Sequence, residues 1–525
     1  MFCRLVIWFT LTTLITSSAA SEVFGDRTVE ISLKNANGHN QISYEQQFTL
    51  FANEIWTLSV RDFPPNISFG ILQVHAYAYN ISLAYSQNMT YENSVNGTNV
   101  GLNIKEDNDL YLFNTGPFTN ISIMIIVTAY DESAPVPGGC NMEFPTEQAS
   151  YLQVYDIQNL HKVVAAPASV PNSICGRPNI KYDWYHYFLP SRDFSEQSYF
   201  QYLKDMVTVE QIMKHGALST QKFGPAVTRL YNAIIGNGVV VALIASIENT
   251  TFKAAYVPYL TYSCSLVFSE NSCDVLPTTF SKVLCGITFA LGFALCFFGN
   301  KLELLQIAGT CSIICGILAY IASTAFYLSV DACLWISVLF ATIGGISACY
   351  CQFSGMIFRL LGLLFSGLLL GLLLASSIVF YSPESLQLVQ SNAAYYTVMI
   401  AVTILVAIFI AITTCCGNEI SSAIVGSTLL SLPIDYYYGG HFQYVLINTI
   451  RYAIVNDFKY AVVTPPFQWI DGIISVVRLV AAVLGIWIQL RSFCSSRRNV
   501  PGSIKGRLLS QGHRSYGSDN VFLSP

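Results

Sequence analysis

Residues 357–380 read IFRLLGLLFSGLLLGLLLASSIVF, an apolar stretch in which Arg359 is the one charged residue. A helix of these 24 residues would be about 36 Å long, and the hydrocarbon core of a bilayer is roughly 30 Å thick. Further apolar segments follow one another with short gaps, at about 282–298, 303–326, 332–350, 396–414, 420–438 and 470–490. Residues 282–490 are therefore predicted to form an all-α bundle of seven transmembrane helices.

Small residues recur at helical spacing in two of these segments. Gly367 and Gly371 lie four residues apart in the stretch quoted above, and Gly344 and Ala348 repeat the pattern in the preceding segment. Small side chains on one helix face allow a second helix to approach closely. We expect these faces to pack against other helices of the same chain, with a dimer face as the alternative.

The composition of the whole chain agrees with a membrane protein. Hydrophobic residues make up 53% of its 525 residues and charged residues 11%, whereas soluble domains carry roughly 25% charged residues. The net charge of −5 excludes a basic protein that binds nucleic acid. Residues 21–281 hold 23 acidic and 13 basic residues, and residues 282–525 hold 8 acidic and 12 basic ones. This asymmetry indicates that the two halves face two compartments.

The amino terminus has the pattern of a targeting segment. Arg4 precedes an apolar run from Leu5 to about Ile15, and the small residues Ser18 and Ala20 stand at the positions that signal peptidase requires. Residues 1–20 are predicted to be a cleaved signal peptide, with an uncleaved anchor helix as the alternative. Either alternative places the following half of the chain in the lumen or outside the cell.

The half before the first span is predicted to be a glycosylated and oxidised ectodomain. Its Asn-x-Ser/Thr sequons lie at Asn66, Asn80, Asn88, Asn96, Asn120 and Asn249, and none follows in the helical half. That distribution fits a luminal glycoprotein domain. The same half contains Cys140, Cys175, Cys264 and Cys273. Four cysteines allow three pairings; proximity favours Cys140–Cys175 and Cys264–Cys273, and the alternative leaves one pair reduced.

Short runs rich in β-forming residues fill this half, for example Ile55–Val60, Ile121–Tyr130 and Gly238–Ile247, with Asn, Gly and Pro between them. About 260 residues are enough for two sandwiches of roughly 100 residues each. We predict two β-sandwich-like units, a glycosylated one over residues 21–165 and a second over 166–281. One helix, from Ser195 to about Lys214, is expected within the second unit.

Seven spans take the chain from a luminal start to a cytosolic end. Lys301 and Arg359 then fall on the cytosolic side, and the tail, residues 491–525, carries six basic residues against Asp519 alone, as the positive-inside rule requires. We predict a multi-pass protein of the plasma membrane or secretory pathway, with the N-terminus extracellular or luminal and the C-terminus cytoplasmic. Cys494, beside the membrane, is a candidate for palmitoylation, with an ordinary reduced thiol as the alternative.

One segment does not fit a simple span. Residues 441–468 contain Arg451, Asp457 and Lys459 in an otherwise apolar stretch. The segment is expected to lie on the membrane surface as an amphipathic helix or to enter the membrane and return. An eighth span is disfavoured because it would place the basic tail outside.

Three charged residues fall inside predicted spans: Asp435, Asp471 and Arg478. A lone charge in lipid is costly, so Arg478 is expected to face the bundle and to pair with an acid, first of all Asp435. Such a pair would be either a packing ion pair or a relay or substrate site.

Motifs of catalysis are not found. None of the seven histidines falls in a predicted span, which argues against an intramembrane zinc hydrolase and a Ser/His protease. Asp435 and Asp471 lack the Gly-x-Gly-Asp context of an aspartyl protease. We expect no enzyme activity, no metal and no cofactor.

Several short sequence motifs, taken in this order, resemble those of one known family. They are Glu22-Val-Phe-Gly25, Val136-Pro-Gly-Gly-Cys140, Tyr185-His-Tyr-Phe-Leu-Pro190, Thr261-Tyr-Ser-Cys264, Cys296-Phe-Phe-Gly299 and Pro466-Phe-Gln468. Together they resemble the transmembrane 7 superfamily member 3 family over nearly the whole chain. The resemblance implies a seven-span glycoprotein of the cell surface and secretory pathway, associated with cell survival under stress. It also implies that Cys140 and Cys264 are framework cysteines, and it brings no catalytic residues. The short tail departs from the family and puts any tail-based function in doubt.

The leading hypothesis from the sequence is a receptor-like or scaffold membrane glycoprotein. Its partners would be the lipid bilayer and a protein bound by the ectodomain. The alternative is a transporter or channel with a path near Arg478 and Asp435.

Overall fold

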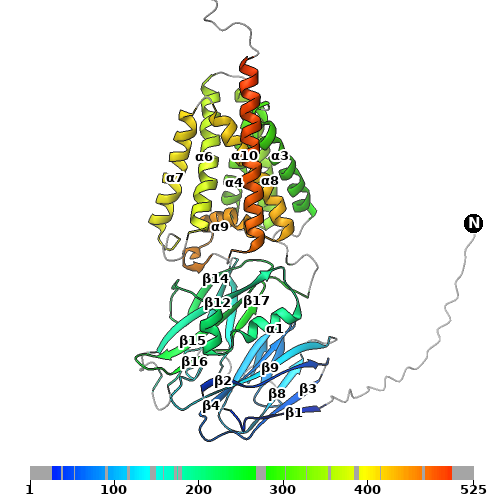
Figure 1. Ribbon diagram of the computed structural model, residues 1–525. Helices are drawn as coiled ribbons and strands as arrows, with labels where there is room; N and C mark the ends of the chain where they lie inside the picture. Colours follow the sequence, from blue (N-terminus) through cyan, green and yellow to red (C-terminus); the bar gives the residue numbers. More distant parts are fainter. Residues whose placement is uncertain are drawn as a thin grey trace, which may run out of the picture. The chain divides into compact units, whose positions relative to one another are not determined.

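The computed structural model describes residues 26–498, with gaps that leave the signal segment and most of the tail outside. The gaps within it are 37–38, 53, 89–92, 115–118, 142–148, 158, 171–173, 176–179, 268–272, 274–278, 302, 327, 353–355, 383–388, 414–415 and 464–466. Figure 1 shows the strands and helices along the chain, and the contacts divide the chain into two compact units. Unit 1 takes Met1–Tyr151, Ala166–Ile180 and Ala245–Val257, and unit 2 takes Leu152–Ala165, Lys181–Ile244 and Pro258–Pro525.

Unit 1 contains a β-sandwich. One sheet has the order β1 (Asp26–Ser32), β3 (Ile55–Arg61), β8 (Asn108–Asn114), β5 (Ile81–Ala84) and β6 (Ser94–Gly97). The other has the order β2 (His39–Leu50), β9 (Ile121–Tyr130), β4 (Phe69–Ala76) and β7 (Asn99–Ile104). Trp56 of the first sheet is fully buried and meets Phe48 of the second edge-on, with 5.6 Å between ring centroids. Aromatic and β-branched side chains that face inward from both sheets thus form the core.

Unit 2 contains a second pair of sheets. One has the order β10 (Leu152–Ile157), β11 (Leu160–Ala165), β14 (Thr228–Asn232) and β18 (Ala461–Val462). The other contains β13 (Ala217–Leu218), β12 (Ile180–Ser191) and β15 (Asn237–Ile247), with β17 (Tyr259–Thr261) paired to β15. β16 (Lys253–Ala255) falls in the part of the chain assigned to unit 1. β18 belongs to the helical half of the chain, so that half completes a sheet of the second sandwich.

The helix expected from Ser195 to Lys214 is two helices, α1 (Glu196–Lys204) and α2 (Val209–His215). Ser195 caps the first, and the side chain of Thr208 accepts the N–H of Gln211 at the start of the second. Gln211 in turn bonds back to Thr208, which completes a capping box. The prediction of one continuous helix is therefore wrong at residues 205–208, which separate α1 from α2.

The helical half contains α3 (Thr279–Phe298), α4 (Glu303–Thr324), α5 (Val330–Gln352), α6 (Met356–Phe380), α7 (Asn392–Ile412), α8 (Gly417–Tyr438), α9 (Gln443–Ile454) and α10 (Trp469–Arg498). In the described part, five helices are long and apolar enough to cross a membrane: α4, α5, α6, α7 and α10. α3 contributes a shorter apolar helix, Lys282–Phe298. α8 is interior to the bundle, and it buries Ser421, Ser427 and Ser431 against its neighbours.

Glycines set how closely the helices approach. A Cβ on Gly426 of α8 would lie 2.3 Å from the backbone N of Cys296 in α3, and one on Gly485 of α10 would lie 2.4 Å from the Cys296 O. Gly371 of α6 faces Thr403 of α7, and Gly344 of α5 faces α4 in the same manner. The expected packing of small-residue faces within the chain is confirmed.

Candidate functional site

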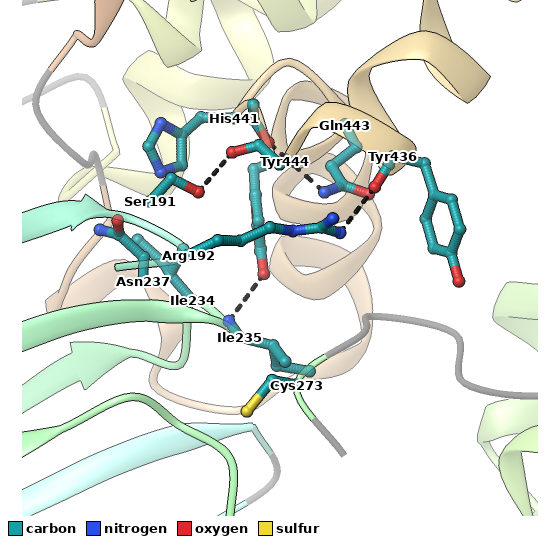
Figure 2. Close-up of a pocket in the computed structure, with 12 residues that line it drawn as sticks. Ser191, Arg192, Ile234, Ile235, Asn237, Cys273, Tyr436, His441, Gln443 and Tyr444 are labelled. Atoms are coloured by element: carbon teal, nitrogen blue, oxygen red, sulfur yellow. Dashed lines mark hydrogen bonds between the residues drawn. The ribbon is translucent and has the colours of Figure 1, made fainter. Parts of the chain in front are cut away.

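Loops of the second sandwich meet the ends of α8, α9 and α10 at one place in unit 2, here called the junction. Arg192, directly after β12, donates from Nη2 to the Tyr436 O at 2.8 Å (Figure 2). Its Nη1 donates to the Tyr437 O, also at 2.8 Å. Ser191 Oγ donates to the Gly439 O. These carbonyls are left without partners inside α8, and a cation there is favoured by the helix dipole. The sandwich therefore caps the C-terminus of α8.

Asp435 and Asp471, which sequence places inside spans, accept backbone N–H groups at the starts of α9 and α10. Asp435 accepts the N–H groups of Phe442 at 3.2 Å and Gln443 at 2.8 Å, where α9 begins. Asp471 accepts the N–H of His441 at 2.7 Å and that of Gln468 at 3.0 Å, where α10 begins. Both carboxylates are buried, and each satisfies amides that a helix start leaves unpaired.

The expected pair of Arg478 and Asp435 is wrong. The ion pairs recorded among described residues do not join them, and the Arg478 Cζ lies 4.4 Å from the ring centroid of Phe442 instead. The oxygens of Asp435 are already occupied by backbone amides at the start of α9. Residue types in the sequence do not reveal these partners, because nearly every residue has a backbone N–H group.

Arg451 of α9 anchors the segment to the sandwich. Its Nη1 donates to Asn232 Oδ1 at 2.5 Å and to the Ala233 O at 2.9 Å. Asn232, at the end of β14, also donates to Asn448 Oδ1 at 3.0 Å. Arg451 is 7% exposed, and burial lowers its pKa from the usual 12.5. A buried guanidinium of this kind depends on its acceptors.

Segment 441–468 also pairs with a strand of the second sandwich, which neither expectation for it included. After α9, residues Ala461 and Val462 pair in parallel with Leu230 and Tyr231 of β14. The Tyr444 hydroxyl accepts the N–H of Ile235 at 2.9 Å, and burial raises the pKa of Tyr444 to about 12. The segment is therefore docked on the second sandwich, and its position relative to the membrane stays a prediction. Its partner strand lies far upstream, so no local pattern announces the pairing.

A small polar pocket lies at the junction, lined by Ser191, Arg192, Asn237, His441 and Tyr444, among others (Figure 2). His441 Nδ1 lies 3.0 Å from Asp471 Oδ2, whereas His441 Nε2 and Asn237 Nδ2 lack hydrogen-bond partners. The pocket has room for about one water molecule. The described residues contain no cluster of three side chains suited to a metal ion. This pocket can hold a bridging water but not a substrate.

A second cluster links β10, β11 and the chain after β17. His161 bonds to Asp156 through Nδ1, and its Nε2 lies 2.6 Å from Ser263 Oγ. The order resembles a catalytic triad, but the Asp156 side chain is 81% exposed, so it is solvated rather than held in a low-dielectric site. The Ser263 N–H donates to Thr261 Oγ1 and is not free as an oxyanion donor. The cluster is a structural link between residues too far apart in the sequence for a local pattern to predict it.

His186 of β12 makes the second sandwich sensitive to acid. It is buried, and burial lowers its pKa from 6.5 to about 4 because the charged form loses hydration. Below pH 6.5 the unfolded chain binds a proton that the folded chain does not, so stability falls with pH, by about 2 kcal/mol at pH 5. We expect His186→Gln to flatten the decrease in unfolding temperature between pH 7 and pH 5. An unchanged slope would contradict this origin.

The remaining sequence-predicted residues are placed as follows. All six sequon asparagines are exposed, as attachment of a glycan requires, and all six belong to unit 1. Disulfides join Cys140 to Cys175 in unit 1 and Cys264 to Cys273 in unit 2, the pairs favoured by proximity. The side chain of Cys494 lies outside the described residues.

Three family models match the chain in order. They are the TM7SF3-like N-terminal immunoglobulin-like domain at residues 37–130, the TM7SF3-like second immunoglobulin-like domain at 135–267 and the TM7S3/TM198-like domain at 285–490. The chain belongs to the transmembrane 7 superfamily member 3 family. In this family's terms, the two sandwiches are immunoglobulin-like domains, and the last model includes α9 and β18.

Relatives named "Transmembrane 7 superfamily member 3" match across most of their length. The Homo sapiens protein is 27% identical over 455 residues, which is 82% of this chain and 79% of the relative. The Mus musculus protein is 26% identical over 453 residues, 82% of this chain and 80% of the relative. These proteins are named as members of a transmembrane superfamily and not as enzymes. The chain is a multi-pass membrane protein of this family, with immunoglobulin-like domains followed by a helical region.

Proposed function

We propose that the protein is a receptor-like or scaffold membrane glycoprotein whose immunoglobulin-like domains bind a protein partner. The observation that carries this proposal is the junction. β18 and Arg451 make the α8–α10 connection part of the second immunoglobulin-like domain, and Arg192 caps α8. A displacement in that domain would therefore act directly on α8 and α10. A binding domain on a flexible linker would not transmit in this way.

The proposed topology has seven spans, namely the five apolar helices together with α3 and α8. α8 has 22 residues, enough for about 33 Å, and its polar side chains face neighbouring helices, where lipid does not reach them. With residues 1–20 as a signal peptide, the domains are luminal or extracellular and the tail from residue 491 is cytoplasmic. The protein would reside in the plasma membrane or secretory pathway. Cell survival under stress, with which the family is associated, is the proposed cellular setting.

The transporter alternative has less support. The carboxylate oxygens of Asp435 and Asp471 already accept hydrogen bonds from backbone amides near helix starts. The pocket beside them has room for about one water molecule. A conduction path near Arg478 and Asp435 would need these groups to exchange partners with a moving ion.

A glycosylation and protease-protection map of the tagged full chain in microsomes tests the topology. We expect glycans on the six sequons, removed one at a time by Asn→Gln, and a C-terminal tag open to protease. A protected tag would mean an even number of spans, and it would contradict the proposed orientation.

Site-specific photocrosslinking in cells tests partner binding. Probes replace exposed Tyr155 and Met213 of the second immunoglobulin-like domain, with Leu405 of α7 as the matched exposed apolar control. We expect one protein adduct shared by the two domain positions and lipid adducts at the control. Domain positions that give no protein adduct, in cells under stress or at rest, would contradict a receptor or scaffold role.

A further inference from the structure

Arg478 is a cation in an apolar helix, and it forms no ion pair with the described residues. It lies in the third turn of α10, inside the apolar segment Trp469–Ser492. Its guanidinium stacks on the Phe442 ring, and the described residues supply it with no ion pair within 4 Å and no recorded hydrogen bond. A guanidinium carries five N–H donors. The ring offsets part of the charge and satisfies none of those donors.

The two carboxylates of the junction are already engaged. Asp435 accepts two amides at the start of α9, and Asp471 accepts two amides and contacts His441. These bonds hold both acids at the junction. Arg478 therefore needs an anion or a polar group from outside the described chain, because an unpaired charge within lipid is costly.

The guanidinium is directed toward the junction-side end of the helices. Side chains on a helix lean toward its N-terminus, and for α10 this is the end at Trp469. The ring beneath the guanidinium belongs to Phe442, which immediately precedes α9 at that end. Exposed aromatic residues, namely Tyr381, Tyr437, Tyr438 and Trp469, gather at the same helix ends. Such a belt marks the level of the lipid headgroups, and a long basic side chain snorkels to that level.

A second donor stands beside Arg478. Tyr381 directly follows α6 and is 43% exposed; its hydroxyl is hydrogen-bonded to Ser475 of α10 and lies close enough to Arg478 for electrostatic interaction. A planar guanidinium next to a hydroxyl fits the oxygens of a phosphate, which accept two parallel bonds from arginine.

We propose that Arg478 and Tyr381 bind the phosphate group of a phospholipid in the leaflet at the junction-side end of the helices, above the Phe442 ring. The proposal depends on α10 crossing the bilayer and not on the protein partner proposed above. A carboxylate on a partner's membrane helix is the competing ligand. The headgroup level of the guanidinium favours phosphate, since a partner's acid buried in its own span would lie deeper in the hydrocarbon.

The test uses the purified full chain in nanodiscs that contain a phosphatidylcholine analogue with a photoreactive headgroup. We expect crosslinks on peptides that contain Tyr381 and Phe442, and we expect Arg478→Gln to lower their yield at least about tenfold. Arg478→Lys should retain part of the yield, and Tyr381→Phe should give an intermediate loss. The matched control is Arg491→Gln on the same helix, which also removes a guanidinium stacked on an aromatic ring, that of Trp487. It should leave these crosslinks unchanged.

Competition identifies the ligand chemistry. Unlabelled phosphatidylglycerol should suppress the crosslinks, and a galactosyl diacylglycerol, which lacks phosphate, should not. Equal suppression by both lipids, or an unchanged yield in a folded Arg478→Gln protein, would overturn the proposal. Release of a copurifying membrane protein by Arg478→Gln, with unchanged lipid crosslinks, would overturn it in favour of a partner helix.

Discussion

Asn232→Ala is expected to lower the free energy of unfolding of the full chain by about 3 kcal/mol. The substitution removes the Oδ1 atom that accepts Arg451 Nη1 and leaves the guanidinium buried with the Ala233 O as its remaining described acceptor. It also removes the bonds from Asn232 to Asn448 and to the Val463 O. Thermal unfolding of the protein in detergent, followed by intrinsic fluorescence, measures the loss.

A second substitution distinguishes two effects of Asn232→Ala: the loss of an acceptor for the buried Arg451 guanidinium and the loss of packing. Adding Arg451→Met to Asn232→Ala removes the buried charge that the first change leaves without its acceptor. We expect Arg451→Met to cost less stability in the Asn232→Ala background than in the wild type, which is a coupling that independent sites would not show. Asn35→Ala, at an exposed asparagine in unit 1, should stay within about 0.5 kcal/mol of the wild type. An additive double variant would mean that Arg451 is not anchored by Asn232.

The parts of the fold that follow a local period could be predicted. The apolar segments predicted at 303–326, 332–350 and 357–380 lie within or close to α4, α5 and α6, because burial in lipid demands a continuous apolar run. The β-rich half could be predicted as well, from short runs of β-branched and aromatic residues. The break between α1 and α2 had a local signal too, the capping-box residues Thr208 and Gln211, which the helical periodicity concealed.

The junction could not be predicted, because its partners are remote in sequence or are backbone groups. The pairing of Ala461 and Val462 with β14 covers two residues and has no pattern of its own. The sequence marks Asp435 as a charge in need of a partner, and its partners are amides of the chain that follows it. Sequence thus located the unusual residues of the site, and the three-dimensional arrangement supplied their roles.

Gly426→Ala is expected to destabilise the helical half strongly, although it adds only one methyl group. A Cβ at Gly426 would lie 2.3 Å from the Cys296 N, 2.7 Å from its Cα and 2.9 Å from the Gly292 O. These are backbone atoms of α3, so no side chain can rotate away, and α3 and α8 must separate. Overpacking of this kind costs about 3 kcal/mol or more, and Cys296 also contacts α10 through the Ala481 O.

Gly286→Ala is the matched control, since it makes the same change in α3 where no atom lies within 4 Å of the added Cβ. In a helix interior the methyl group there should be neutral or stabilising, by up to about 1 kcal/mol. The measurement is the amount of folded protein that survives detergent extraction and its unfolding temperature. If Gly426→Ala matched Gly286→Ala in both, the close contact of α3 with α8 would be wrong. Without that rigid contact, a displacement of the second immunoglobulin-like domain would not be transmitted through α8 to α3.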